Sequence, residues 1–390
     1  MNFSIKTEDL QRALARVSRA VPAHSTVPIL TNVLVNADNS TQTVTFTGFD
    51  LSVAVQSCHK ADVSSGGAVA LPGAVLARLA KSFGGDEVRF SNVHKQDECC
   101  VECGSFVGKL IACDAAEFPL IPDEDAVIPE EVDASAVAGL LSRAIPAASN
   151  DATRANLNSV FMEAAKGADG RRILRAVALD GHRMHVCETI GPDGGAGLPD
   201  KGGAIVPLGA AKELQRLLAE TSEHEALLGF SSKVVLCHRG EVTFVARLVD
   251  GAFPDYREIL PPSDFSGLCV SAVRLATELR SLSVFVMDRD ANGARMTQQG
   301  SRLELNLATG LGSGESSVQC RPLKDDAEER DAVVCANISY LLDALNAAPW
   351  VCVQICIDDP MSPIIIRRAE DDGLPFELFC GVVMPIRIDG

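Results

Sequence analysis

Residues 7–21 read TEDLQRALARVSRAV, and this stretch has the spacing of an amphipathic helix. Leu10 and Leu14 begin a series of apolar residues at intervals of three and four, which share one helix face at about 100° per residue. Arg12 and Arg16 fall on the opposite face. The pattern therefore predicts a helix that packs through one side and carries positive charge on the other.

Two later segments repeat this stretch. DASAVAGLLSRAIPA begins at Asp133 and SAVRLATELRSLSVF begins at Ser271. When the segments are aligned on Leu10, Val137 and Leu275, the steps between them are 127 and 138 residues. A period of this size indicates that one structural unit occurs three times along the chain.

Two further landmarks recur in the same order. An apolar strand runs into a second helix in GGAVALPGAVLARLAKSF, GGAIVPLGAAKELQRLLAE and DAVVCANISYLLDALNAA. A closing strand ends near Pro119, Pro254 and Pro385, which are 135 and 131 residues apart. Each unit therefore contains two helices and several strands.

Alternating segments such as TVTFTG, VTFVARLV and RLELNLA lie between these landmarks, and they are typical of half-buried strands. Proline-rich and acidic stretches near residues 128 and 262 mark probable boundaries. We predict an α+β chain of three repeated domains, 1–128, 129–262 and 263–390, each with two helices packed on antiparallel sheets.

The charge of the chain is divided unevenly. Its formal net charge is -17. Five of the predicted helical stretches nevertheless contain ten Lys or Arg and only four Asp or Glu, so the rest of the chain carries -23. A basic face on one helix is usually only a solvated face, but its repetition in an acidic chain favours a shared surface for phosphates.

The composition predicts a packed intracellular protein. Hydrophobic residues make up 47% of the chain and charged residues 22%. We expect a cytoplasmic location, because the N-terminus lacks an export signal and no apolar run has the length of a membrane span. The thirteen cysteines are an odd number in a long chain, so we expect reduced thiols.

The segment ALDGHRMHVC carries the residues that would suit catalysis. Asp180 and His182 could exchange protons, and a hydrolase that uses them is the rival hypothesis. No nucleophile motif or phosphate-binding loop accompanies them. A tight Asp-Gly turn with a structural His182 and Arg183 is the interpretation that the residues alone favour.

Two other motifs are poor candidates for a metal site or a cofactor site. HKQDECCVEC offers His94, Cys99 and Cys103, but zinc sites usually show two spaced ligand pairs, and strand alternation would turn Cys100 to the opposite face. TGLGSGESS lacks the spacing of a dinucleotide fingerprint and is more typical of a hairpin. We predict no catalytic residue, no metal and no cofactor.

Several segments together resemble the bacterial DNA polymerase III beta subunit family, the replication sliding clamps. They are TVPILTNVLV from Thr26, ALDGHRMHVC from Ala178, RLVDGAFPDYREILP from Arg247, NISYLLDALNA from Asn337 and VVMPIRI from Val382. The likeness extends over nearly the whole chain. It implies a non-catalytic processivity factor for DNA replication and not an enzyme.

The resemblance implies a homodimer whose subunits join head to tail into a closed ring around duplex DNA, without reading its sequence. It also implies partners that attach through short peptides: the DNA polymerase III alpha subunit, the clamp loader, other polymerases and repair proteins. No membrane partner is expected. A repeat scaffold that does not bind DNA remains a third alternative.

The resemblance assigns a partner-peptide pocket, and charge and apolarity indicate two further sets of candidate residues. The partner-peptide pocket comprises Leu157, Leu179, Gly181, His182, Arg183, Met184, Pro254, Ile259, Tyr340, Val382, Met384, Pro385, Ile386 and Arg387. The DNA-facing residues, most of which lie on the basic helix faces, are Arg12, Arg16, Arg78, Lys81, Arg143, Arg154, Lys212, Arg216, Arg274 and Arg280. Leu110, Phe285 and Val286 are apolar candidates for the dimer interface, although burial in a core explains them equally well.

The chain also departs from the family pattern. Glu258 stands where a basic residue is often found, and Pro363 stands where a small polar residue is common. His24 replaces an arginine that some relatives use for DNA. Asp389 and Gly390 extend beyond the usual apolar end. These differences bear on which peptides the pocket prefers and on how strongly loops contact DNA.

Overall fold

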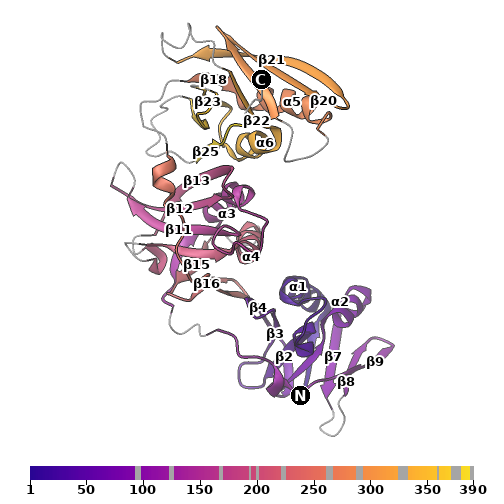
Figure 1. The fold of residues 1–390 in the computed structure, drawn as a ribbon. Helices are drawn as coiled ribbons and strands as arrows, with labels where there is room; N and C mark the ends of the chain where they lie inside the picture. The colour runs from indigo at the N-terminus through magenta and orange to yellow at the C-terminus, as the bar shows by residue number, and fades with distance from the viewer. Residues whose placement is uncertain are drawn as a thin grey trace. The chain divides into compact units, whose positions relative to one another are not determined.

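The structure is a computed structural model, and it forms two compact units. It describes residues 1–92, 98–122, 127–166, 170–192, 195–198, 202–220, 225–260, 267–286, 293–323, 333–357, 360–369 and 379–386. Unit 1 contains residues 1–134 and 216–248, and unit 2 contains residues 135–215 and 249–390. Each unit combines α-helices with antiparallel sheets (Figure 1).

All the predicted helices are present. Across the described ranges the α-helices are α1 (Thr7–Val17), α2 (Gly73–Ser82), α3 (Ala134–Ala144), α4 (Leu208–Ala219), α5 (Ala272–Ser283) and α6 (Ile338–Ala347). Side chains fix the start of two of them. Ser271 Oγ accepts the N–H of Arg274 at 3.4 Å, and Asn337 Oδ1 accepts the N–H of Ser339 at 2.8 Å.

Unit 1 contains two sheets. The five-stranded sheet has the order β5-β1-β7-β8-β9, and its strands are β1 (Asn2–Lys6), β5 (Asp62–Ser65), β7 (Glu87–Asn92), β8 (Glu98–Cys103) and β9 (Phe106–Ile111). The eight-stranded sheet has the order β10-β15-β16-β17-β4-β3-β2-β6, and its strands are β2 (Asn32–Asp38), β3 (Thr43–Phe49), β4 (Val53–Lys60), β6 (Gly67–Pro72), β10 (Glu130–Asp133), β15 (Glu225–Phe230), β16 (Val234–Arg239) and β17 (Val242–Arg247).

Unit 2 contains one sheet of twelve strands. Its order is β14-β11-β12-β13-β25-β24-β23-β18-β21-β20-β19-β22. The strands are β11 (Ser159–Lys166), β12 (Arg172–Leu179), β13 (Arg183–Ile190), β14 (Ala204–Pro207), β18 (Leu268–Ser271), β19 (Gly293–Gln299), β20 (Arg302–Thr309), β21 (Gly312–Pro322), β22 (Val333–Asn337), β23 (Cys352–Cys356), β24 (Ile364–Arg368) and β25 (Phe379–Val383).

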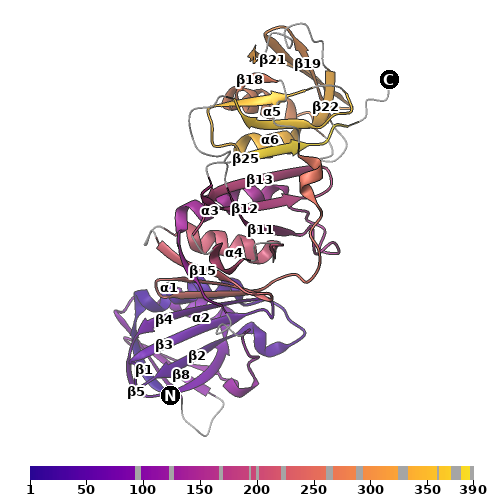
Figure 2. The same cartoon turned by 90° about the vertical axis from the view of Figure 1, so that its left-hand side faces the viewer.

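The helices pack on these sheets in pairs. In unit 1, α1 lies against α2 and β4, and Leu10 and Leu14 on its inner face are buried (Figure 1). In unit 2, α5 lies against α6, and Leu275 and Leu341 are buried at their inner faces (Figure 2). The apolar spacing that predicted the helices therefore also predicts which side of each helix is buried.

The sheets run across the boundaries predicted from the sequence. In unit 1, β17 pairs with β4, with Val245 opposite Ala54. In unit 2, β13 pairs with β25, with Val186 opposite Cys380. Backbone hydrogen bonds thus connect segments that the sequence assigned to neighbouring domains, and the three-domain division stays a prediction.

Local predictions for two motifs are confirmed. Cys99 and Cys103 are buried on one face of β8, and Cys100 lies on the other face. Thr309 and Gly312 are opposite each other at the turn of the β20–β21 hairpin. His94 lies outside the described residues. No disulfide joins the thirteen cysteines, all of which are in the described ranges. In those ranges no helix is both long enough and apolar enough to span a membrane.

Candidate functional site

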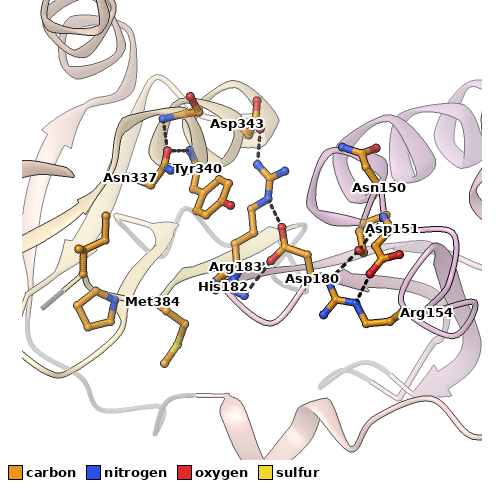
Figure 3. Close-up of a pocket in the computed structure, with 15 residues that line it drawn as sticks. Asn150, Asp151, Arg154, Asp180, His182, Arg183, Asn337, Tyr340, Asp343 and Met384 are labelled. Carbon is orange, nitrogen blue, oxygen red and sulfur yellow. Dashed lines mark hydrogen bonds and ion pairs between the residues drawn. The ribbon is translucent and has the colours of Figure 1, made fainter. Parts of the chain in front are cut away.

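A cavity of about 540 Å³ in unit 2 brings together four segments of the chain (Figure 3). One wall comes from the connection between α3 and β11, and a second from the turn between β12 and β13. The start of α6 and the residues after β25 complete it. The lining residues are Ala148, Ser149, Asn150, Asp151, Arg154, Asp180, His182, Arg183, Asn337, Ser339, Tyr340, Asp343, Met384, Pro385 and Ile386.

The Asp-Gly turn of the DGHR segment forms the edge of the cavity. Asp180 Oδ1 accepts the backbone N–H groups of His182 at 2.8 Å and of Arg183 at 3.0 Å. Gly181 has φ of 95°, in the left-handed region that favours glycine. The Asp180 carboxylate, which the hydrolase hypothesis would use for proton transfer, therefore stabilises the turn itself.

Arg183 is held between two acids and an aromatic ring. Its Nε lies 3.1 Å from Asp180 Oδ2, and its Nη1 pairs with Asp343 Oδ2. The guanidinium also lies 4.3 Å from the centroid of the Tyr340 ring. The side chain of Arg183 is only 9% exposed. Because its Nε and Nη1 groups are already engaged, Arg183 fixes the cavity wall and joins β13 to α6.

A second ion pair lies on the opposite wall. Arg154 Nε is 3.1 Å from Asp151 Oδ2, and both side chains are about half exposed (50% and 43%). Asp151 Oδ1 also accepts the Thr153 hydroxyl and backbone N–H at 2.7 and 3.0 Å. These hydrogen bonds lower the pKa of Asp151, with Thr153 as the main cause. Arg154, which the sequence assigned to DNA, thus lines this cavity.

The apolar part of the cavity comes from the residues after β25. Met384 is 40% exposed, and its N–H donates to His182 O at 2.8 Å. Ile386 N–H donates to Cys335 O at 2.7 Å. These two bonds hold Met384, Pro385 and Ile386 at the cavity edge, with the Met384 side chain open to a ligand.

Six residues of the predicted pocket line the cavity: His182, Arg183, Tyr340, Met384, Pro385 and Ile386. Leu179, Met184 and Val382 instead belong to a buried cluster on the twelve-stranded sheet, against which Leu157 packs. Gly181 lies in the turn, Pro254 is half-buried and Ile259 is 41% exposed. Arg387 lies outside the described residues.

A buried acid anchors the segment that carries Pro254 and Ile259. Glu163 Oε1 accepts the Tyr256 hydroxyl at 2.5 Å, and its Oε2 pairs with Arg257 Nη2 at 2.5 Å. Burial alone would raise the pKa of Glu163, but the hydrogen bonds from Tyr256, Arg175 and Arg257 outweigh it and lower the pKa. This cluster explains why the FPDYRE residues lie on the sheet.

Acids partly neutralise the basic face of α1. Arg16 pairs with Glu220 at 3.0 Å and with Glu241 at 3.5 Å, and its side chain is 15% exposed. Arg12 pairs with Asp9. The sequence could not show this, because Glu220 and Glu241 are more than 200 residues away from α1.

The other residues predicted to face DNA keep their places on the helices. Arg78 and Lys81 lie on α2, Arg143 lies on α3, and Lys212 and Arg216 lie on α4. On α5, Arg274 follows the N-terminal cap, and Arg280 donates to Asn346 at 2.7 Å. Their contact with DNA stays a prediction.

The predicted interface residues differ in exposure. Leu110 on β9 is 7% exposed and points into the unit, whereas Val107 and Ile111 on the same strand are 66% and 73% exposed. Strand β9 is the last strand of its sheet. Phe285 and Val286, which follow α5, are half-buried. On this edge strand the apolar side chains that are open to a partner therefore belong to Val107 and Ile111, and not to Leu110.

Sequence reasoning did not assign several of the polar residues that line the cavity. Ser149, Asn150 and Asp151 lie in a connection without a regular pattern. Asp343 is 160 residues away from its partner Arg183. Only the pairing of β13 with β25 and the position of α6 bring them together. The described residues contain no group of three or more His, Cys, Asp or Glu that could hold a metal ion.

Comparison with known proteins agrees with this fold. Residues 1–122 match the model of the DNA polymerase III beta subunit N-terminal domain, and residues 131–255 match that of the central domain. The beta sliding clamps of Synechococcus elongatus and Haemophilus influenzae are 28% and 27% identical to the chain, and each alignment covers both proteins completely.

Solved structures show the same likeness. A Caulobacter crescentus beta sliding clamp is 24% identical, with a TM-score of 0.89 over 100% of this chain and 99% of that one. The Pseudomonas aeruginosa DNA polymerase III subunit beta is 25% identical, with a TM-score of 0.88 over all of both chains. A P. aeruginosa clamp bound to griselimycin has a TM-score of 0.86 over all of both chains and is also 25% identical.

The fold and the cavity define a binding protein of the clamp class, whose members are processivity factors and not catalysts. The two matched domain models together cover residues 1–122 and 131–255, and the relatives match from end to end. The chain belongs to the DNA polymerase III beta subunit family, the bacterial sliding clamps. The resemblance seen in the sequence is thus confirmed.

Proposed function

We propose that two copies of this chain close head to tail into a ring around duplex DNA and tether the replicative polymerase, so that synthesis is processive. The full-length match to beta sliding clamps is the observation that carries this proposal. The ring contains six domains, three from each chain, with boundaries near residues 128 and 262. It works in the cytoplasm, where bacterial DNA is replicated.

The exposed edge of β9 supports the closure of the ring. Val107 and Ile111 leave apolar side chains in water at the end of a sheet, and an unpaired sheet edge readily accepts another strand. A head-to-tail contact joins unlike surfaces, so β9 of one chain meets the third domain of the other. Phe285 and Val286 are the residues that we assign to that partner surface.

The helices supply weak contacts to DNA. The exposed bases of α2, α4 and α5 include Lys81, Lys212 and Arg274, and charges of this kind bind phosphates without reading base sequence. Acidic side chains partly neutralise Arg12 and Arg16, so α1 attracts DNA phosphates less strongly. Weak contacts suit a ring that stays on DNA by topology and slides along it.

The cavity of unit 2 takes the short peptides of partner proteins. Met384 and Tyr340 provide apolar surface for a Leu or Phe anchor, and the Ser149–Asp151 connection provides polar groups for the peptide backbone. The partners are the DNA polymerase III alpha subunit, the clamp loader, other polymerases and repair proteins. Leu179, Met184 and Val382 lie in the buried cluster of the same sheet and do not line this cavity.

Sedimentation velocity of the pure chain tests the assembly. The proposal expects a dimer with twice the chain mass of 41.2 kDa. A protein that remains a monomer at all concentrations could not form the proposed ring around duplex DNA. A strictly monomeric chain would therefore contradict the proposal.

A further inference from the structure

Two cysteine side chains meet on the twelve-stranded sheet. Strands β18 and β23 pair in antiparallel register, with Cys269 opposite Gln354 and Ser271 opposite Cys352. Residues that are opposite each other, or two positions away, project from the same face of a sheet. Cys269 and Cys352 are therefore diagonal neighbours on one face.

The environment of this pair permits thiol chemistry. Cys352 is exposed and Cys269 is half-buried. Burial raises the pKa of Cys269, and the adjacent Cys352 raises it further, while a hydrogen bond and the charge of Arg321 act in the opposite direction. The two thiols are thus close enough to affect each other, and the guanidinium of Arg321 only partly offsets the rise in the pKa of Cys269.

Other cysteines lack this combination. Cys237 is buried, and burial raises its pKa to about 12. Cys99 and Cys103 share a face, but four residues along one strand separate them by about 13 Å, too far for a bond. Cys320 on β21 is opposite the residue that follows Cys269, so it projects from the other face.

We propose that Cys269 and Cys352 form a reversible intramolecular disulfide when the chain meets hydrogen peroxide. The Cys352 thiolate attacks one peroxide oxygen, the O–O bond breaks, and the released hydroxide takes a proton to become water. The Cys269 thiolate then attacks the sulfur of the resulting sulfenic acid. The S–S bond forms as the S–O bond breaks, and the released hydroxide takes a proton to become a second water. Two thiols are oxidised and one peroxide is reduced to two waters.

The position of the pair suits a reversible bond. Cys352 begins β23, and Ala272 N–H donates to Val351 O at 2.9 Å beside it. Diagonal residues lie somewhat further apart than a disulfide prefers, so the strand ends must move slightly. An exposed bond of this type is easily reduced, as a reducing compartment requires. It would link β18, which leads into α5, to β23.

Peroxide treatment of the full-length chain, followed by alkylation and digestion without reductant, tests this proposal. We expect one peptide pair joined through Cys269 and Cys352, two fewer alkylated thiols, and full reversal by a dithiol. Cys269→Ser and Cys352→Ser each abolish the link. Cys58→Ser, which alters another exposed cysteine, leaves it intact.

A sulfenic-acid trap distinguishes the two steps. Cys269→Ser accumulates sulfenic acid at Cys352, whereas Cys352→Ser accumulates none at Cys269. Arg321→Gln slows the loss of that sulfenic acid without changing its formation, because Arg321 is a positioning residue for Cys269. Oxidation of Cys352 with no internal link in the unaltered chain, or a link only between separate chains, would overturn the proposal. Neither result bears on the clamp function.

Discussion

The guanidinium carbon of Arg183 lies 4.3 Å from the centroid of the Tyr340 ring, so β13 and α6 meet through a cation and an aromatic face. Asp180 and Asp343 pair with the same guanidinium. The ring of Tyr340 is thereby fixed at the cavity edge. The wall that we assign to peptide recognition is therefore preorganised before any ligand binds.

Replacing Arg183 should destabilise unit 2. Arg183→Met leaves the 12%-exposed Asp180 carboxylate without its cation, and breaking such a buried pair costs about 3 to 5 kcal/mol of unfolding free energy. Arg154→Met is the matched control, because that exposed pair contributes under about 1 kcal/mol. Urea unfolding monitored by circular dichroism measures both. Equal losses would show that burial does not strengthen the Arg183 pair.

Shortening Met384 should weaken peptide binding. Met384→Ala removes exposed apolar surface from the cavity and should raise the dissociation constant of a polymerase tail peptide about tenfold, which is about 1.4 kcal/mol. Met361→Ala changes a methionine that is 59% exposed and outside the lining, and should have no effect. Fluorescence anisotropy of a labelled peptide gives both values. An unchanged affinity in Met384→Ala would remove this residue from the binding site.

A charge on the exposed face of β9 should separate the subunits. Ile111→Glu places a carboxylate in an apolar contact, so we expect the dimer dissociation constant to rise about 100-fold or more. Leu120→Glu, at a leucine that is 91% exposed, serves as the control. Sedimentation equilibrium measures the dissociation constants. Full dimerisation of Ile111→Glu would exclude β9 as the interface.

Acid should destabilise unit 2 through His185. Its Nδ1 lies 2.7 Å from Arg143 O, and burial lowers its pKa from 6.5 to about 4. Between those two values the unfolded chain binds a proton that the folded chain does not. Stability is therefore complete above pH 6.5 and falls towards pH 4, by on the order of 3 kcal/mol.

Thermal unfolding across that pH range, with a His185→Gln variant, measures this effect. The variant should be less stable at neutral pH and should lose less stability on acidification than the unaltered chain. His24→Gln, which changes an exposed histidine, should keep the original pH dependence. A His185→Gln variant with an unaltered slope would assign the acid sensitivity to other groups, such as the buried His59, whose pKa burial also lowers.

The sequence predicted the helices well because their pattern is local. The spacing of Leu10 and Leu14, which recurs at Leu275, involves residues within one or two helical turns. Such a local pattern can be recognised in the sequence before the fold is known. The Asp180 turn was also predictable, since an Asp-Gly pair has specific backbone preferences.

Long-range pairing was not predictable. Nothing near β4 indicates that β17 will extend its sheet, and nothing near α6 indicates that Asp343 will meet Arg183. The sequence left open whether Leu110 lies in a core or at an interface, and the pairing of β8 with β9 places it on the buried face of the sheet. Such features depend on segments that approach only in the folded chain.

Retention on circular DNA tests the central claim most directly. The chain is loaded onto a nicked circle by a clamp loader and passed over a sizing column, before and after the circle is cut once with a restriction enzyme. A closed ring that slides should remain on the intact circle and leave the linear molecule through its ends. Equal loss from both forms, or equal retention on both, would contradict encirclement.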